Sequence, residues 1–214
     1  DALCQGGLDV AADLPAQTLR AARTRPGIRL HRTAGTRQIV LRIDPAFPPF
    51  DQPKVREALA RALPYETVTR NLNDGRVESP PAVQDHRVAR TLLREAAYGS
   101  GFRLSLHLSE GNPDLQAVAH SIQVDAMRLD IKFVLEVMES GLFSREKAAR
   151  HLPLYLDERR PVVPWLSAEE AEPLRQVETV VVAQLAAYVA ARSGIDGFVR
   201  HPDRRPRYFE LRKP

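Results

Sequence analysis

The order in which helical and strand-like patterns follow one another in the middle of the chain is the strongest constraint on its fold. Val55, Leu59 and Leu63 recur at helical spacing and give a helix one apolar face. Residues 103–108 alternate between apolar and polar side chains, as a half-buried strand does, and residues 131–137 are predicted to form the next strand. A helix is predicted between these two strands, and strand–helix–strand order is typical of an α/β architecture.

Three helices beyond the first are predicted from capping residues and apolar stripes. One covers residues 65–72 and is followed by Gly75, which can adopt the left-handed backbone angles common after a helix. Asp85 is expected to cap the second at its N-terminus. The third covers residues 114–129. The side chains expected to point inward from the last two helices are Val88, Leu92, Leu93, Ala96, Val118, Ile122 and Met127.

The N-terminal part of the chain mixes helix and strand signals. A helix is predicted to run through Arg23, and two strands are predicted over residues 28–32 and 38–43, separated at Gly35. Residues 44–53 contain four prolines, at positions 45, 48, 49 and 53. Because each proline fixes its own φ angle and lacks a backbone N–H, this segment is predicted to be a loop and a hinge or segment boundary.

The C-terminal part is harder to interpret from periodicity. Residues 144–152 and 168–177 are predicted to be helical, and residues 208–211 to form an edge strand. The apolar run over residues 177–191 is ambiguous, because its alanines favour a helix whereas Val180–Val182 favour a buried strand.

The charge balance leaves a nucleic-acid-binding module open as one alternative. The chain has 31 Lys and Arg residues against 27 Asp and Glu, a formal net charge of +4. A nucleic-acid site needs positive charge gathered on one face, whereas these arginines are spread along the chain among acidic residues. The densest group is predicted to be a solvated tail, with an anion-binding tail as the alternative: Arg200, Arg204, Arg205, Arg207, Arg212 and Lys213.

The motifs of common enzyme classes are missing, so no enzyme, cofactor or metal site is predicted. There is no glycine-rich phosphate loop, no pair of histidines at metal-binding helical spacing and no Gly-x-Ser-x-Gly elbow. Cys4 is the single cysteine, which excludes an internal disulfide. Glu169, Glu170 and Glu172 open a predicted helix, where acidic side chains favour the positive end of the helix dipole.

Five segments, in order, resemble the extracellular solute-binding proteins of peptide, dipeptide and nickel ABC importers. The family has a helix with Val-Arg-x-Ala-Leu after a proline-rich linker, a Leu-Leu-x-Glu-Ala helix that leads to Gly-x-x-x-Gly-Phe-like turns, and a helix that leads into a strand. The matching segments here are Gly6–Val10 with the strand 38–43, Phe50–Leu63, Ala89–Phe102, Ser121–Phe133 and Gln184–Phe198.

The resemblance implies a periplasmic-binding-protein-like α/β lobe, with a mixed sheet flanked by helices and additional strands that belong to the other lobe. Residues 1–45 are then part of lobe I, residues 46–192 form lobe II, and residues 193–214 return to lobe I. It also implies that residues 178–192 form a strand. The chain looks like a fragment of the family, without the upstream part that includes the export signal and early strands of lobe I.

The function implied by the resemblance is capture of a peptide or related small solute between two lobes, followed by delivery to an ABC permease. Such a protein is a periplasmic or extracellular monomer associated with the membrane, and it closes on its ligand by a hinge motion. Because half of the clamp is missing, the fragment alone is expected to bind ligand weakly or not at all.

The ligand-binding residues are also implied by the resemblance. The family places a carboxylate that pairs with a peptide amino terminus where this chain has Asp157. Tyr155 and Trp165 are expected to supply aromatic walls, although core packing is the alternative for Trp165. His151 or Arg150 is expected to meet a ligand carboxylate.

Several residues depart from the family pattern. Ala97 and Asp130 stand where the family usually has glycine. Pro153 and Leu154 stand where the family has the glycine and tryptophan before the binding aspartate. A degenerate scaffold of the same fold, with no transported ligand, is therefore a further alternative.

Two features are predicted to be structural. Arg56 lies between apolar residues and is expected to hold a carboxylate or backbone carbonyls of the scaffold. Gly101 is expected to let the chain turn sharply from a helix into a strand, so that Phe102 enters the core.

Overall fold

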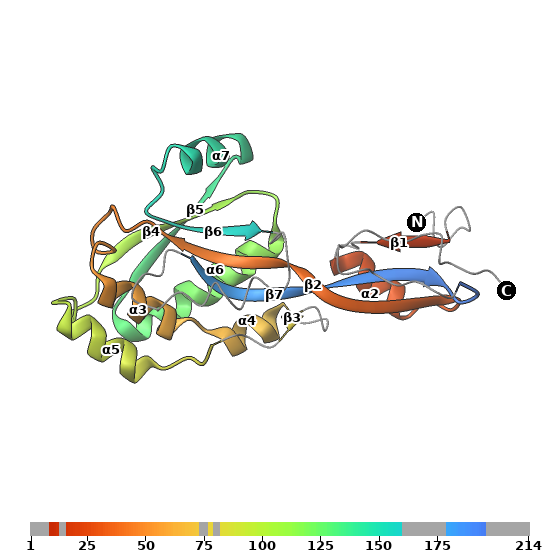
Figure 1. Cartoon of the computed structure of the whole chain (residues 1–214), viewed down its shortest axis with the longest axis horizontal. Helices are drawn as coiled ribbons and strands as arrows, with labels where there is room; N and C mark the ends of the chain where they lie inside the picture. The colour runs from red at the N-terminus through yellow and green to blue at the C-terminus, as the bar shows by residue number, and fades with distance from the viewer. Residues whose placement is uncertain (1–8, 13–15, 73–76, 79–81, 160–178, 196–214) are drawn as a thin grey trace.

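The structure is a computed structural model, which describes residues 9–12, 16–72, 77–78, 82–159 and 179–195. Helices and strands are interspersed along the chain (Figure 1). They are β1 Val10–Ala12, α2 Ala16–Arg23, β2 Ile28–Ile43, α3 Pro53–Ala62, α4 Tyr65–Asn71, β3 Val77–Glu78, α5 His86–Glu95, β4 Arg103–Ser109, α6 Pro113–Ala126, the 3₁₀ turn η1 Met127–Leu129, β5 Lys132–Met138, α7 Ser140–Ala148, β6 Leu154–Arg159 and β7 Thr179–Arg192.

One mixed sheet of seven strands runs through the described part of the molecule. Its order is β1-β7-β2-β6-β4-β5, and β3 pairs with β7 beside this path. β4 pairs in parallel with both β5 and β6, whereas β2 pairs antiparallel with β6 and β7. The segments predicted as strands over 38–43, 103–108 and 131–137 therefore share a sheet, and the predicted mixed α/β fold is confirmed.

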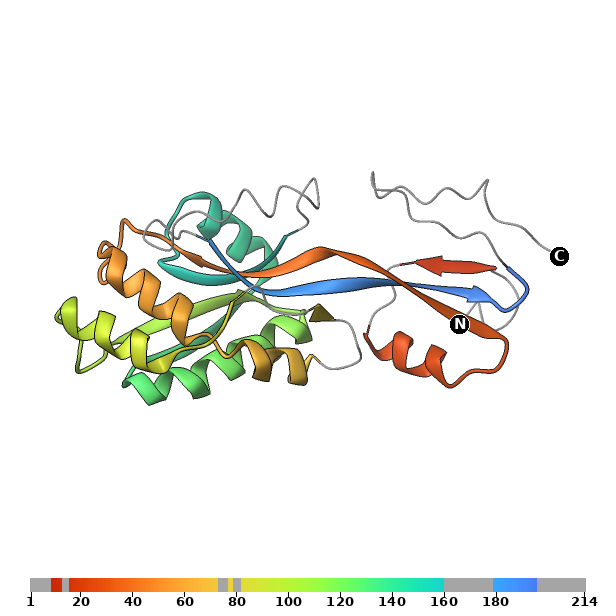
Figure 2. The same ribbon diagram turned by 60° about the horizontal axis from the view of Figure 1, so that its bottom comes forward.

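β2 and β7 form a long antiparallel pair that extends beyond the helix-covered part of the sheet to β1. Figures 1 and 2 show the pair leaving the helix-covered body and running alongside β1 and α2. The prediction of two strands separated at Gly35 is wrong, because β2 is continuous from Ile28 to Ile43. The pairing of β2 with β7 is irregular instead, with register shifts between Thr33 and Arg37 and between Ile39 and Val40. The ambiguous run over 177–191 is a strand, as the family resemblance implied.

The helices lie in unequal layers on the two faces of the sheet. Figure 2 shows α3, α4, α5 and α6 on one face and α7 on the other. The main core lies on the four-helix face, where Leu41, Leu106 and Leu154 are fully buried. Because side chains alternate along a strand, the residues between these leucines point to the α7 face.

Of the helix ends predicted from capping residues, Asp85 lies in the described part of the chain, whereas Gly75 falls outside it. The Asp85 side chain accepts hydrogen bonds from the backbone N–H groups of Arg87 and Val88, so the predicted cap of α5 is confirmed. The inward assignment of Val88 and Met127 is wrong, since they are 38% and 57% exposed. Ala89 is buried in place of Val88. Met127 lies in the 3₁₀ turn after the end of α6. The α-helical spacing that predicts its inward position does not apply there.

α7 begins earlier than the helix predicted over residues 144–152. The Glu139 carboxylate accepts hydrogen bonds of 2.9 Å from the N–H groups of Gly141 and Leu142, which starts the helix at Ser140. These two hydrogen bonds hold the pKa of Glu139 below its usual value. The predictions for residues 168–177 and 208–211 fall outside the described residues.

The predicted turn at Gly101 is confirmed. Gly101 has a φ of +76°, and a β-carbon there would lie 2.1 Å from the carbonyl oxygen of Asp130. Phe102 follows and packs edge-on against Phe50 and Tyr98. The turn therefore depends on the close approach of two backbone segments that only glycine permits.

Arg56 has the scaffolding role predicted for it. Its side chain is buried, and Nη1 donates to the backbone carbonyl oxygen of Phe50 at 2.5 Å. This contact fixes the proline-rich loop after β2 against the first turn of α3.

Candidate functional site

A row of polar side chains crosses five neighbouring strands on the face that carries α7. The strand registers align Thr179, Arg42, Tyr155, His107 and Glu136, which lie on β7, β2, β6, β4 and β5. Residues in register on neighbouring strands point to the same face, so the five form one line, here called the polar row. Polar atoms thus gather on the face opposite the main core.

His107, at the centre of the polar row, contacts both neighbouring strands. The buried His107 places Nδ1 3.0 Å from the carbonyl oxygen of Leu154 and Nε2 3.3 Å from a carboxylate oxygen of Glu136. Through these two contacts His107 links β4 to its neighbours on both sides. Its role is therefore to hold the strands that position Tyr155.

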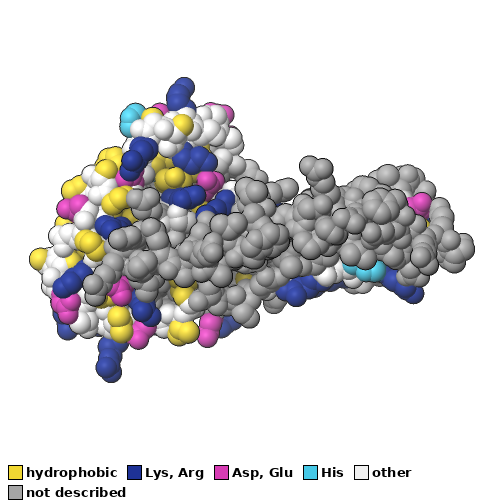
Figure 3. All heavy atoms as spheres, in the orientation of Figure 1, with side chains coloured by type: hydrophobic (Ala, Val, Ile, Leu, Met, Phe, Trp, Pro, Cys, Tyr) yellow, Lys and Arg dark blue, Asp and Glu magenta, His cyan; other side chains and the backbone are white. Residues whose placement is uncertain are grey.

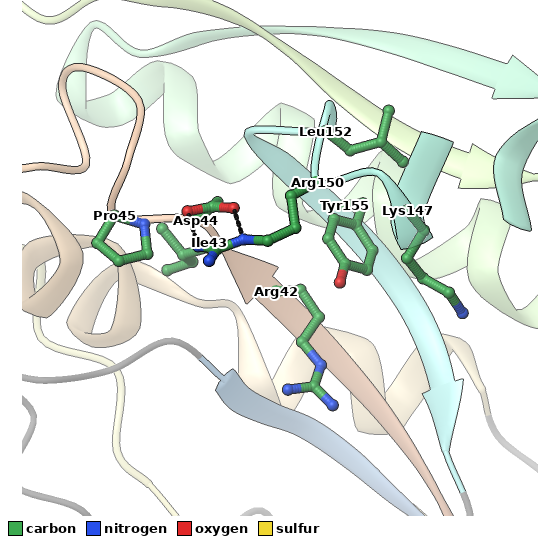
Figure 4. A pocket seen from close by; sticks show the side chains of 8 residues that line it. All are labelled: Arg42, Ile43, Asp44, Pro45, Lys147, Arg150, Leu152 and Tyr155. Carbon is green, nitrogen blue, oxygen red and sulfur yellow. Dashed lines mark hydrogen bonds and ion pairs between the residues drawn. The ribbon is translucent and has the colours of Figure 1, made fainter. Parts of the chain in front are cut away.

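α7 packs over the polar row and forms one wall of a pocket. The ring of Phe143 meets the ring of Tyr155 edge-on, with centroids 5.9 Å apart. The pocket lies between α7 and the end of β2 and has a volume of about 270 Å³ (Figure 4). Its lining residues are Arg42, Ile43, Asp44, Pro45, Lys147, Arg150, Leu152 and Tyr155.

Two ion pairs stand at the pocket. Arg150 donates twice to the carboxylate of Asp44, at 2.9 and 2.7 Å, and these hydrogen bonds lower the pKa of Asp44. Lys147 Nζ lies 2.9 Å from Oδ2 of Asp157. Figure 3 shows basic, acidic and apolar side chains side by side on the surface below α7. Both carboxylates are therefore held by cations from α7 or its C-terminal end.

Arg42 and Tyr155 complete the pocket as cross-strand partners. Arg42 donates a hydrogen bond to the hydroxyl oxygen of Thr179. Burial raises the pKa of the Tyr155 hydroxyl, and the Arg42 guanidinium opposes this rise. Tyr155 is therefore neutral at physiological pH and can donate a hydrogen bond into the pocket.

The predicted site residues are only partly brought together. Tyr155 lines the pocket, and Asp157 lies beside it through its contact with Lys147. His151 is not in the lining; its Nδ1 is 2.9 Å from Glu146 and its side chain is 65% exposed. Trp165 falls outside the described residues, as do Cys4, the glutamates at 169, 170 and 172, and the arginine-rich tail.

Sequence reasoning did not find Arg42 or Lys147. The available signal was a single charged residue, Arg42, inside the otherwise apolar end of the strand 39–43. Lys147 gave no such signal, because an exposed helix normally carries charged residues.

Within the described ranges, no group of three or more His, Cys, Asp or Glu side chains is arranged to hold a metal ion. None of the described helices combines the length and apolar character required to cross a membrane.

Comparison with known proteins identifies the family. The sequence profile of the bacterial extracellular solute-binding proteins, family 5, middle region, matches residues 1–165. The chain therefore belongs to the family 5 extracellular solute-binding proteins, which are binding proteins of ABC importers.

Curated relatives match over part of the chain. The glutathione-binding protein GsiB of Pectobacterium atrosepticum is 32% identical over 108 residues, which cover 44% of this chain and 21% of GsiB. GsiB of Salmonella typhi is 31% identical over the same length. The match thus spans about a fifth of the curated relatives.

Solved structures share the fold across nearly the whole chain. The dipeptide-binding protein of Pseudoalteromonas sp. SM9913, in complex with Met-Leu, superposes with a TM-score of 0.75 at 17% identity and covers 100% of this chain. The substrate-binding protein CtaP of Listeria monocytogenes gives 0.81 at 13% identity and covers 99%. This chain corresponds to 55% and 57% of those two structures.

Proposed function

We propose that this chain is part of the substrate-binding component of an ABC importer, which captures a peptide or a related small solute and delivers it to a permease. Residues 46–192 would form lobe II, and residues 1–45 and 193–214 would belong to lobe I. The ligand would lie against the α7 face of the sheet, with lobe closure excluding water from it.

The observation that carries this proposal is the combination of charges and an aromatic wall at one pocket. Asp157 offers a carboxylate to the ammonium group of a peptide, and Tyr155 offers a ring surface beside it. A peptide ammonium has the same charge as the Lys147 ammonium that now contacts Asp157. The ligand can therefore join or replace Lys147 without leaving the carboxylate unpaired.

The relatives support this class of ligand. The curated relatives are named as glutathione-binding proteins, and one structural neighbour holds the dipeptide Met-Leu. Both ligands are short peptides that carry an ammonium group and at least one carboxylate. A zwitterionic peptide is therefore the ligand class that we assign to this protein, in an extracellular or periplasmic location.

The proposal can be tested by isothermal titration calorimetry with Ala-Ala and with glutathione at millimolar concentrations. The titrations use the two-lobed protein that contains this chain, because one lobe alone is expected to bind weakly or not at all. Asp157→Asn should weaken binding of the better ligand by about tenfold or more, because a hydrogen-bonded charge is lost. Glu95→Gln is the matched control, since Glu95 also pairs with a lysine, Lys54, at 2.9 Å but lies on α5 behind the other face of the sheet. The control should bind as the wild type does.

Two results would contradict the proposal. One is the absence of any heat of binding with a panel of short peptides and with glutathione. The other is an Asp157→Asn variant, folded by circular dichroism, that binds with unchanged affinity. A gel-shift assay at several salt concentrations tests the alternative that the chain binds nucleic acid. Binding that depends on phosphate contacts would fall steeply as the salt concentration rises.

A further inference from the structure

The geometry points to Arg42 as the anchor for a ligand carboxylate, so that the pocket beside α7 selects ligands with an anionic group. This inference rests on the proposed function and adds the chemistry of one subsite. Three features support it: the charges at the pocket, the position of Arg42 in the polar row and the volume of the pocket that Arg42 lines.

Among the described residues, the positive and negative charges at the pocket do not balance. Arg150 is paired with Asp44 and Lys147 with Asp157. Arg42 is the fifth charged group, and within the described ranges its one hydrogen bond goes to the neutral hydroxyl of Thr179. With both carboxylates already held by other cations, the five groups carry one net positive charge.

The guanidinium of Arg42 has donors to spare. A guanidinium carries five N–H donors in a fixed plane, and a carboxylate can accept two of them side by side. Thr179 Oγ1 takes a bond from Nη1, which leaves the other N–H groups available to a ligand. Figure 4 shows the Tyr155 hydroxyl on the side of its ring nearer to Arg42, where it can add a further donor. Arg42 on β2 and Tyr155 on the neighbouring β6 thus both present donors to the same pocket.

The pocket also has room for such a group. Its volume of about 270 Å³ is several times the roughly 30 Å³ that one water molecule occupies in the liquid. Ile43, Pro45 and Leu152 line the remainder with apolar surface. A half-buried guanidinium in such a site binds a carboxylate more strongly once water is excluded, because the local dielectric constant falls.

The carboxylate can come from the C-terminus of a peptide or from an acidic side chain, and four probes separate these sources. Ala-Gln carries only the terminal carboxylate, Ala-Glu amide only the side-chain carboxylate, Ala-Glu both and Ala-Gln amide neither. The protein and its variants would be titrated with each probe by calorimetry. We expect Ala-Gln amide to bind at least tenfold more weakly than the best of the other three.

The variants assign this preference to Arg42. Arg42→Gln should bring the four affinities to within about twofold of one another, whereas Arg42→Lys should keep part of the difference because the charge remains. Thr179→Val removes the neutral partner of Arg42 and should leave the preference in place. Arg87→Gln on α5 is the control for loss of one positive charge elsewhere, and it should behave as the wild type does.

The outcomes distinguish this inference from the proposed function. If the wild type binds all four probes equally, or if folded Arg42→Gln keeps the full preference, Arg42 is not the anchor although the chain binds peptides. If none of the four binds and a wider peptide panel also fails, the proposed function is wrong and the inference falls with it.

Discussion

Lys147 Nζ lies 2.9 Å from Oδ2 of Asp157, so a cation from α7 occupies the carboxylate that we assign to a peptide ammonium group. The two residues come from different elements: Lys147 is in the last turn of α7 and Asp157 is on β6. Lys147 is thus placed to compete with a cationic ligand group for the same oxygen.

Removal of Lys147 should therefore strengthen binding of amine ligands. We expect Lys147→Met to bind alaninamide, which has an ammonium group and no carboxylate, several-fold more tightly than the wild type. The stability of the protein should fall by no more than about 1 kcal/mol, because partly exposed ion pairs contribute little. Calorimetry and urea unfolding measure the two effects, and weaker alaninamide binding in the variant would contradict the proposed competition.

The close backbone contact at Gly101 predicts that Gly101→Ala costs much more stability than Gly111→Ala. Gly101→Ala should destabilise the protein by about 3 kcal/mol or more, since it adds a clash with Asp130 to the cost of a positive φ. Gly111 has a φ of +81° but open space around it, so Gly111→Ala should cost only about 1–2 kcal/mol. Urea unfolding compares them, and equal losses would show that the backbone contact relaxes easily.

Ala97 predicts the opposite effect, a gain of stability on substitution by glycine. Its φ of +63° lies in the left-handed region, which costs a residue with a β-carbon about 1–2 kcal/mol. Part of this gain is offset because glycine loses more backbone entropy on folding. Ala97→Gly should therefore stabilise the protein by about 0.5–1 kcal/mol.

The control for Ala97→Gly is an alanine in ordinary helical backbone. Ala148 is exposed in the last turn of α7, and Ala148→Gly should destabilise the protein by about 0.5–1 kcal/mol. Thermal unfolding of both variants should show shifts of opposite sign. A loss of stability in Ala97→Gly would contradict the interpretation of its backbone strain.

The Arg150–Asp44 pair predicts a pH-dependent contribution to stability. The pKa of Asp44 is lowered in the folded protein, chiefly by the hydrogen bonds from Arg150, so the folded state binds this proton less tightly than the unfolded state. The stabilisation is therefore present above the ordinary value of 3.8 and is lost as the pH falls through the lower folded value.

Arg150→Ala should consequently reduce stability at pH 7, by about 0.5–1 kcal/mol for a pair that is partly exposed. As the pH falls below the lowered pKa of Asp44 in the folded protein, the difference in stability between the variant and the wild type should disappear. Arg145→Ala is the control, since Arg145 lies on α7 shortly before Arg150, is 74% exposed and is 3.7 Å from Glu146. If Arg150→Ala lost as much stability in acid as at pH 7, the stability contribution assigned to the Arg150–Asp44 pair would be contradicted.

Local sequence patterns predicted most of the elements, because each depends on residues close together in the chain. The Asp85 cap and the Val55 stripe of α3 are of this kind. The continuity of β2 could not be predicted from local patterns, because Gly35 taken alone indicates the end of a strand. Pairing with β7 on both sides of this glycine, over residues 28–33 and 37–42, holds the strand extended across it.

The pocket was harder to predict than the fold because its parts come from distant segments. Arg42, Tyr155 and Thr179 are neighbours only through the registers of three strands. Asp157 and Tyr155 were reached through the family resemblance, whereas Arg42 required knowledge of which strands pair. A pattern within a single segment contains no information on that pairing.

The two register shifts between β2 and β7 have a mechanical consequence. Both strands pass without interruption from the helix-covered body to the segment beside α2, so no loop separates the two ends of this ribbon. An irregularity in an antiparallel ladder removes regular hydrogen bonds and sharpens the local twist. We therefore expect the ribbon to bend most easily near Thr33/Arg37 and Ile39/Val40, where the ladder is irregular.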